Sequence, residues 1–214
     1  MEEKKKKLKI GIDIDEIVTE FVLGFLKFFN KKYNKNFNFE DMFSYDFWET
    51  LDIDKEESFR LAGDFFHSSF NTIELVEGAI KSINKLSENN EIFFITSRPI
   101  NTKDKTENFL KSKFPYLKFK VFYSGDRFGR GKSKREICND MGINFLIEDQ
   151  EKYVLDCAES NVKCLLFDKP WNKNCPEHEN IIRVNDWNEI METIKMLTKK
   201  SKIENLSCFP QGEF

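Results

Sequence analysis

The sequence predicts an α/β fold with a central parallel sheet between two helical layers and a helical segment inserted after the first strand. From residue 75 onward, short apolar runs alternate with helix-length amphipathic segments, which is the pattern of strand–helix–strand units. The stretch 19–77 separates the first two expected strands by far more than one crossover helix needs. We therefore expect a core of residues 1–18 and 78–200, a helical cap of residues 19–77, and a flexible tail of residues 201–214.

The expected elements follow from these runs in chain order. Five short apolar runs bounded by polar residues predict strands at 8–14, 91–96, 117–123, 144–148 and 162–167. The amphipathic segments predict helices at 76–89, 103–113, 133–142, 150–160 and 186–199. Gly142 and Asn161 are residues that commonly end a helix. The tail 201–214 has mixed polarity with a Pro and a Gly, which indicates a poorly ordered terminus.

Aromatic side chains are dense in the stretch 19–77, and many recur at helical spacing. That spacing favours packing inside the cap over contact with a ligand. Four aromatic residues lie near the first polar motif or in polar loop positions, and these are the candidates for stacking on a flat leaving group: Phe21, Phe43, Tyr45 and Trp48.

Composition argues against several classes of protein. The 34 basic and 37 acidic residues give a net charge of −3, so the chain as a whole does not attract nucleic acid polymers or anionic membranes. No apolar run approaches the roughly 18 residues of a membrane span, and the basic opening lacks a signal-peptide core, so we expect a cytoplasmic protein. Five cysteines without a CxxC pair predict reduced thiols. The oligomeric state is left open.

Polar and charged residues follow the ends of the expected strands. The set comprises Asp13 and Asp15 after the first strand, Thr96, Ser97 and Arg98 after the second, Glu148 and Asp149 after the fourth, and Lys134 at the start of the preceding helix. The carboxyl ends of parallel strands meet at one edge of the sheet, where ligands bind. Carboxylates gathered there repel one another unless a cation holds them, and Mg²⁺ prefers carboxylate, water and phosphate oxygens. The sequence therefore predicts a Mg²⁺ and phosphate site.

The roles within this set follow from side-chain chemistry. A chain leaving its strand can turn Asp13 and Asp15 toward one phosphorus, so that the first attacks and the second moves a proton. Thr96, Ser97 and Lys134 are expected to bind the phosphoryl group. Arg98 has two open interpretations, because its guanidinium can reach a phosphate or pair with a neighbouring carboxylate.

Four segments in order, GIDIDEIV, FFITSRP, GKSKREIC and FLIED, resemble the four motifs of the haloacid dehalogenase (HAD) superfamily of phosphatases. The resemblance covers residues 8 to about 190. It implies that Asp13 is the nucleophile and Asp15 the general acid/base, with Thr96 and Lys134 holding the phosphate. Lys134 is preferred over Lys132 because the sequence that follows it resembles the family's lysine, helix, glycine, strand and acidic-pair pattern.

The same resemblance implies a Mg²⁺ ligand set. It consists of Asp13, the backbone carbonyl of Asp15, and Asp149, with Glu148 beside them orienting water or metal. Glu148 replaces the first member of the usual Asp pair. Glu16 stands where a Gly is common, and its longer acidic side chain is expected to crowd or repel an anionic substrate.

A finer resemblance is to the 5′(3′)-deoxyribonucleotidases and their bacterial relatives, through ITSRP, the cap insertion, LLFDKPWNKN (165–174) and RVNDWNEI (183–190). It implies a phosphatase acting on (deoxy)nucleoside monophosphates through an aspartyl phosphate. A phosphatase of sugar or other metabolite phosphates, and a non-catalytic protein that binds a phosphorylated ligand, are the alternatives. The loop 126–131 contains Arg and Gly but lacks the spacing of a P-loop, and neither His67 nor His178 lies in a metal-ligand cluster.

Overall fold

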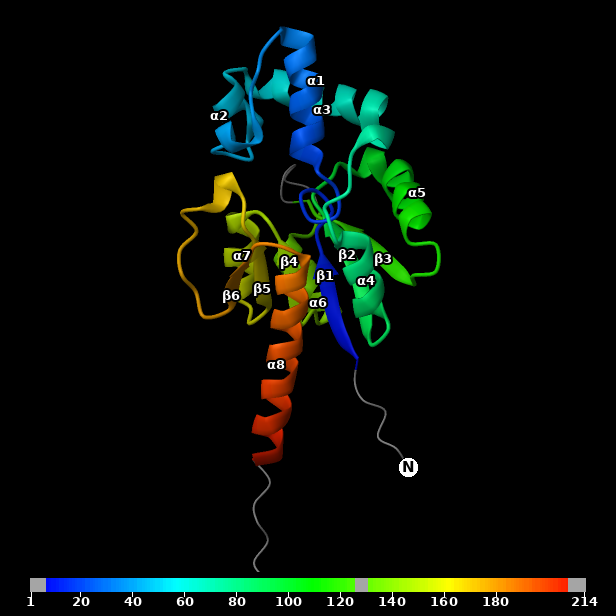
Figure 1. Cartoon of the computed structure of the whole chain (residues 1–214), viewed down its shortest axis with the longest axis vertical. Coiled ribbons are helices and arrows are strands. Elements are labelled where there is room, and N and C mark those ends of the chain that lie inside the picture. The colour runs from blue at the N-terminus through cyan, green and yellow to red at the C-terminus, as the bar shows by residue number, and fades with distance from the viewer. Residues whose placement is uncertain (1–6, 126–130, 208–214) are drawn as a thin grey trace, which may run out of the picture.

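A computed structural model describes residues 7–125 and 131–207, without the side chains of Asn71 and of residues 200–207. All strands of its six-stranded sheet are parallel, in the order β3-β2-β1-β4-β5-β6, so the chain starts in the middle and winds outward in both directions. Helices cover both faces of the sheet, and three further helices lie beyond the carboxyl ends of the strands (Figure 1). The predicted α/β fold with a parallel sheet is confirmed.

The strands are β1 (Leu8–Ile12), β2 (Asn90–Thr96), β3 (Phe119–Tyr123), β4 (Phe145–Glu148), β5 (Lys163–Phe167) and β6 (Ile181–Val184). The helices are α1 (Phe21–Tyr33), α2 (Phe47–Leu51), α3 (Lys55–Ser69), α4 (Ala79–Ser87), α5 (Lys103–Lys113), α6 (Lys134–Met141), α7 (Glu151–Ala158) and α8 (Trp187–Ser207). Gly142 ends α6 in the left-handed conformation with φ 63°, as predicted.

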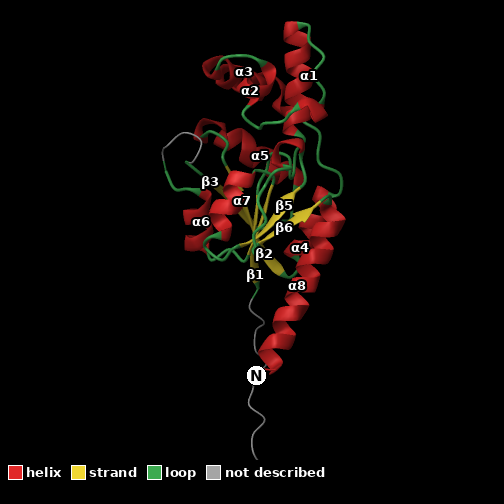
Figure 2. Ribbon diagram, turned by 90° about the vertical axis from the view of Figure 1, so that its left-hand side faces the viewer, coloured by secondary structure: helices red, strands yellow, loops and turns green. Residues whose placement is uncertain are grey.

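The two faces of the sheet bury separate apolar cores because successive side chains of a strand point to opposite faces. In β2, Ile92 and Phe94 belong to the core shared with α4, α5 and α8. Phe93 and Ile95 belong to the core shared with α6 and α7. Figure 2 shows α4 and α8 on one side of the sheet and α6 and α7 on the other. The continuous apolar run of β2 therefore reflects burial on both faces.

Gly11 in the middle of β1 lies on the α6–α7 side of the sheet. A Cβ atom placed there would lie 2.9 Å from Cδ1 of Ile95 and 3.2 Å from Cδ1 of Leu146. The glycine thus lets the two neighbouring strands bring large side chains together beneath the central strand. This packing fixes the end of β1, where the first candidate site residue lies.

The main differences from the predicted elements are two boundaries and one missed strand. Strand β1 ends at Ile12 and not at residue 14, so Asp13 directly follows it. Strand β6 was not predicted, because four residues at a sheet edge, IIRV, give too short an apolar run. Helix α8 continues to Ser207, eight residues beyond its predicted end and into the expected flexible tail, whose last residues 208–214 lie outside the described part of the chain.

The stretch 19–77 holds α1, α2 and α3, which lie beyond the carboxyl ends of the strands (Figure 1). The chain enters and leaves this cap through two segments that run side by side. The backbone N–H of Glu20 donates to the carbonyl of Glu74 at 2.8 Å, and that of Val76 donates to the carbonyl of Val18 at 3.0 Å. This antiparallel contact places the base of the cap over the end of β1.

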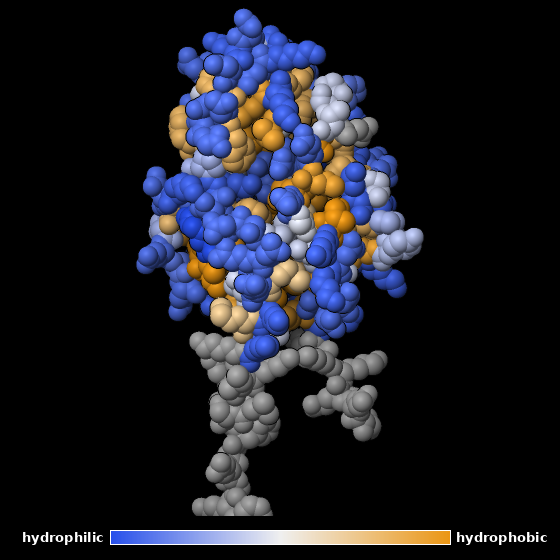
Figure 3. Space-filling model, viewed as in Figure 1, coloured by the Kyte–Doolittle hydropathy of each residue, from blue (hydrophilic) through white to orange (hydrophobic). Residues whose placement is uncertain are grey.

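The described surface and thiols also bear on the composition-based predictions. Within residues 7–125 and 131–207, no helix is long and apolar enough to cross a membrane. The face in Figure 3 is largely hydrophilic, with apolar side chains showing between polar ones on the cap and below it. Cys138, Cys157 and Cys164 are buried free thiols and Cys175 is a partly exposed one, whereas Cys208 and loop residues 126–130 lie outside the described residues.

Candidate active site

The first group of predicted site residues meets at the carboxyl end of β1. Asp13 directly follows the strand, and its backbone N–H donates to the carbonyl of Ile147 in β4 at 3.0 Å. Lys134 is the first residue of α6, which a capping box of Ser133 and Glu136 starts at that position. Glu148 is the last residue of β4. Strand ends and a helix start thus bring two carboxylates and one ammonium together.

The ammonium of Lys134 lies between the two carboxylates. Its Nζ is 2.7 Å from Oδ1 of Asp13 and 2.5 Å from Oε2 of Glu148, and all three side chains are buried. Burial acts to lower the pKa of Lys134, but the carboxylates of Asp13 and Glu148 outweigh it and raise that pKa well above its usual range. Lys134 therefore stays charged, and its ammonium is a fixed positive charge beside Asp13.

Burial also acts on Asp13 itself. It raises the pKa of Asp13 to about 8 in the metal-free protein, against the opposing attraction of Lys134. The neighbouring carboxylates of Glu148 and Asp15 raise the same pKa further. One ammonium among several buried carboxylates leaves an excess of negative charge at this edge of the sheet.

Asp149 carries the clearest sign that a cation belongs here. Its Oδ2 accepts a hydrogen bond from Nε1 of Trp171 at 2.9 Å, whereas its Oδ1 is buried and has no hydrogen-bond partner among the described residues. A carboxylate oxygen of each of Asp13, Glu148 and Asp149 lies within 4.8 Å of the others. A buried carboxylate oxygen without a donor is costly, and a hard cation removes the cost. The residues present fit a divalent metal.

The two acidic residues of β4 and its loop are held by different neighbours. Oε1 of Glu148 accepts the backbone N–H groups of Asp149 and Gln150, each at 3.1 Å. Nδ2 of Asn172 donates to the backbone carbonyl of Asp149 at 2.7 Å. The sequence indicates that Trp171 and Asn172 can border the site, because they follow the fifth expected strand, but it assigns them no catalytic role.

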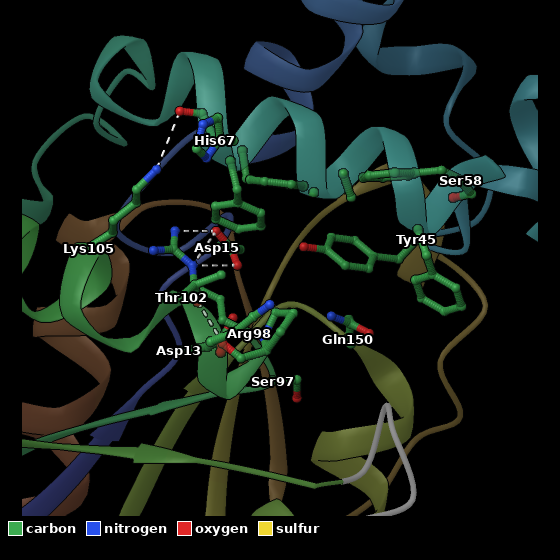
Figure 4. Close-up of a pocket in the computed structure, with 18 of the residues that line it drawn as sticks. Asp13, Asp15, Tyr45, Ser58, His67, Ser97, Arg98, Thr102, Lys105 and Gln150 are labelled. Atoms are coloured by element: carbon green, nitrogen blue, oxygen red, sulfur yellow. Dashed lines mark hydrogen bonds and ion pairs between the residues drawn. The ribbon is translucent and has the colours of Figure 1, made fainter. Parts of the chain in front are cut away.

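Asp15 and Arg98 form a second buried ion pair. Nη2 of Arg98 is 2.6 Å from Oδ1 of Asp15, and Nε is 3.0 Å from Oδ2. Of the two interpretations of Arg98 that the sequence leaves open, the structure shows pairing with a carboxylate. Figure 4 shows this pair at the floor of the cavity beside Asp13.

The other predicted phosphate-binding residues occupy different positions. The hydroxyl of Thr96 is buried and accepts the backbone N–H of Arg98 at 3.2 Å, and Thr96 is not among the residues that line the cavity. Ser97 does line the cavity, and its hydroxyl lies 2.9 Å from the hydroxyls of both Ser124 and Tyr153. Lys132 pairs with Asp140 on the surface, so Lys134 is the lysine beside Asp13.

Glu16 is not among the residues that line the cavity, so the expected crowding of an anionic substrate is wrong, whereas repulsion by its charge stays a prediction. Its backbone has φ 63°, and its buried side chain turns toward the cap, where Oε1 accepts the backbone N–H of Val22 at 2.6 Å. Nζ of Lys169 lies 3.4 Å from Oε2. Burial raises the pKa of Glu16 to about 7, against the attraction of Lys169. Glu16 thus joins the start of α1 to the loop after β5.

A cavity of about 430 Å³ lies between the cap and the ion-paired residues at the strand ends, which are Asp13, Asp15, Arg98 and Lys134. Of the four aromatic candidates, Phe21 and Tyr45 line it, and Figure 4 shows the Tyr45 hydroxyl directed into it. Phe43 is 64% exposed, and Trp48 packs against Phe59 with ring centroids 5.7 Å apart; neither lines the cavity. Those two assignments were wrong.

Helix α3 supplies the part of the cavity wall that sequence reasoning missed. Its cavity-lining residues are Ser58, Phe59, Ala62, Gly63, Phe66 and His67. They recur at the three- and four-residue intervals of one helix face. A Cβ atom on Gly63 would meet nothing within 4 Å. Small residues between two phenylalanines therefore leave room for a ligand beside aromatic faces.

Comparison with known proteins places this arrangement in a family. Residues 6–201 match the profile of the 5′ nucleotidase, deoxy (pyrimidine), cytosolic type C proteins. The chain belongs to this family. A nucleotidase of Clostridium acetobutylicum is 26% identical over 198 residues, which cover 92% of this chain and 98% of that protein.

Solved structures agree on the fold of this 5′ nucleotidase family member. The Bacillus subtilis protein YfnB, named as a HAD-hydrolase and solved with bound magnesium, matches with a TM-score of 0.59 and 15% identity over 89% of this chain and all of that one. A haloacid dehalogenase-like protein of Streptococcus pneumoniae matches with a TM-score of 0.61 and 12% identity, covering 88% of this chain and 98% of that one. The chain is a HAD-type phosphoric monoester hydrolase, as its four motifs predicted.

Proposed function

We propose that this cytoplasmic enzyme hydrolyses (deoxy)nucleoside monophosphates with Mg²⁺ and an aspartyl-phosphate intermediate. The observation that carries the proposal is the buried cluster of Asp13, Lys134, Glu148 and Asp149 beneath an aromatic-walled cavity. The positive charges of Lys134 and a cation attract a phosphate. The apolar walls fit a flat, uncharged group such as a nucleobase.

The metal would be held by Asp13 and Asp149, with the backbone carbonyl of Asp15 and with Glu148 next to it. The support for this assignment is the buried Oδ1 of Asp149, which has no hydrogen-bond partner within residues 7–125 and 131–207. When bound, the cation neutralises phosphate charge and favours the ionised form of the surrounding carboxylates. Lys134 adds a fixed charge that stabilises the transferring phosphoryl group.

The reaction would proceed in two displacements. A carboxylate oxygen of Asp13 attacks phosphorus, the bond from phosphorus to the leaving oxygen breaks, and Asp15 gives its proton to that oxygen. A water molecule then attacks the same phosphorus, its proton passes to Asp15, and the bond between Asp13 and phosphorus breaks. The products are a nucleoside and inorganic phosphate, and both aspartates regain their starting forms.

The test measures release of inorganic phosphate from a panel of nucleoside monophosphates and sugar phosphates, with Mg²⁺ and after chelation. We expect turnover only with the metal, and higher kcat/KM for nucleotides than for sugar phosphates. Asp13→Asn keeps the size of the side chain but removes the attacking anion, so its turnover should fall to background. Preference for sugar phosphates would identify the other metabolite class, and binding without turnover would identify a non-catalytic protein.

A further inference from the structure

The guanidinium group of Arg98 donates hydrogen bonds to other side chains of the protein, whereas an arginine that binds phosphate keeps its donors for the ligand. All three guanidinium nitrogens donate: Nε and Nη2 to Asp15, Nη2 also to Thr19 at 3.4 Å, and Nη1 to Thr106 at 3.3 Å. The side chain is 1% exposed. Binding a phosphate through Nε or Nη2 would require Arg98 to break buried, charge-assisted bonds, each of which is stronger than a neutral hydrogen bond.

We propose that Arg98 is a positioning residue that holds the carboxyl group of Asp15 for proton transfer. The contact is side-on, since Nη2 lies 2.6 Å from Oδ1 and Nε 3.0 Å from Oδ2. Two parallel bonds fix both the place and the plane of a carboxyl group, which a single bond cannot do. The inference rests on the proposed two-displacement reaction and adds a residue to it.

The pairing leaves room for the proton that Asp15 must carry. Oδ1 accepts from Nη2, from Nε and from the hydroxyl of Thr19, whereas within the described part of the chain Oδ2 accepts only from Nε. Each carboxyl oxygen has two lone pairs, so Oδ2 retains one. That lone pair can bear the proton given to the leaving oxygen and later taken from water.

The guanidinium is itself supported from the core and from the cap. Thr106 of α5 accepts from Nη1, and the rings of Phe66 and Phe70 lie 5.2 and 5.1 Å from Cζ, within cation–π range of about 6 Å. These contacts resist displacement of Arg98 when an anion enters the cavity. They also tie the orientation of Asp15 to residues of the cap.

The test varies the leaving group. Protonation by Asp15 matters most for a poor leaving group, such as that of a nucleoside monophosphate or phenyl phosphate, and least for 4-nitrophenyl phosphate. Arg98→Lys keeps the charge but cannot make two parallel bonds. We expect it to lower kcat/KM by about 10- to 100-fold for the poor leaving groups, part of the roughly 10²–10⁴-fold that acid–base catalysis contributes, and by less than about 5-fold for 4-nitrophenyl phosphate.

Inhibition by inorganic phosphate reports separately on phosphate binding. The inhibition constant of phosphate should stay within about 3-fold of wild type in Arg98→Lys. A 3-fold change corresponds to about 0.6 kcal/mol of binding free energy, which is less than the loss of one hydrogen bond to a charged group would cost. Equal losses for all leaving groups together with weaker phosphate inhibition would make Arg98 a phosphate ligand and overturn the proposal. Wild-type kinetics would overturn it as well.

Control variants separate this outcome from misfolding. Arg60→Lys makes the same substitution at an exposed arginine of α3 and should leave every leaving group unaffected. If Arg98→Lys does not fold, Thr106→Val removes the hydroxyl that accepts from Nη1 at constant shape, and we expect the same leaving-group pattern at smaller size. A uniform effect of Thr106→Val would then overturn the proposal. No turnover by the wild-type protein would instead overturn the proposed function, and the role of Arg98 with it.

Discussion

Replacing Asp149 with Asn separates a metal site from an acidic cluster that needs no cation. Oδ2 of Asp149 accepts from Trp171 at 2.9 Å, and an Asn oxygen can keep that bond. The amide nitrogen then takes the place of Oδ1, the buried oxygen without a partner among the described residues. The substitution preserves shape and removes one proposed metal ligand and one negative charge.

The expected size follows from ligand linkage. A metal at 100 times its dissociation constant stabilises the folded protein by about 2.7 kcal/mol. For a chain of 150–250 residues, each kcal/mol shifts Tm by about 2–4 °C, so saturating Mg²⁺ should raise the wild-type Tm by about 5–11 °C. In Asp149→Asn, we expect a shift of less than about 2 °C over the same range of Mg²⁺.

Without metal, we expect Asp149→Asn to cost no stability relative to wild type. Burial and the carboxylate of Glu148 raise the pKa of Asp149 well above its usual range, so removing this acid relieves a strained charge cluster. In the presence of a chelator, the Asn variant should therefore be at least as stable as wild type. A contact that merely packs the loop would give the opposite order.

The assay is thermal unfolding followed by fluorescence, with chelator and across a Mg²⁺ titration. Asp52→Asn serves as the matched control, because Asp52 is exposed and has φ 52°, a conformation that Asn also adopts readily. Its Mg²⁺-dependent shift should equal that of wild type. The same shift in Asp149→Asn, or none in wild type at saturating Mg²⁺, would refute the assignment of Asp149 as a ligand.

Three further predictions use other parts of the structure. The pKa of Asp13 is raised in the folded, metal-free protein from 3.8 to about 8, so the contribution of Asp13 to stability is fully present below pH 3.8 and is lost as the pH rises through about 8. The Tm of the metal-free protein should therefore fall between pH 5 and 8. The fall should be smaller in Asp13→Asn, which has no carboxyl group to titrate at this position. Glu16→Ala leaves the backbone N–H of Val22 and the ammonium of Lys169 without their acceptor. The free energy of unfolding, measured in urea, should therefore fall by about 3–5 kcal/mol, and by less in Glu16→Gln. Equal losses in the two variants would contradict the buried ion pair. Gly63→Leu should fill cavity space and lower kcat/KM for nucleoside monophosphates more than for phenyl phosphate, whose leaving group is also poor, whereas Gly63→Ala should mainly stabilise α3, by about 0.5–1 kcal/mol. Equal kinetic losses on both substrates would show that α3 does not select the substrate.

The sequence predicts the interior of this fold better than its margins. Strands β2 and β5 are continuous apolar runs because both faces of each are covered, and such runs are visible without any partner. Strand β6 lies at the sheet edge, and its Arg183 turns out to pair with Asp168 at 2.7 Å. An arginine satisfied by a distant carboxylate breaks the apolar pattern, so the strand is not evident until the sheet is assembled.

The candidate site divides in the same way. Asp13, Glu148 and Lys134 could be proposed from position alone, because strand ends and helix starts determine which side chains reach the edge of a parallel sheet. The partner of Arg98 could not, because phosphate and carboxylate offer the same two acceptor oxygens to a guanidinium. Only the position of Asp15, 83 residues earlier in the chain, decides between them.

The cap shows why its aromatic residues resist assignment by spacing. Phe66 lines the cavity and also lies 5.2 Å from the guanidinium carbon of Arg98, which in turn holds Asp15. One side chain thus contributes to the cavity wall and to the support of Asp15, the proposed proton-transfer group. A substitution of Phe66 should change substrate preference and leaving-group dependence together, whereas Gly63, whose Cβ position faces open space, should change preference alone. Comparing the kinetics of variants at Phe66 and at Gly63 therefore measures the cap's role in substrate selectivity apart from its role in catalysis.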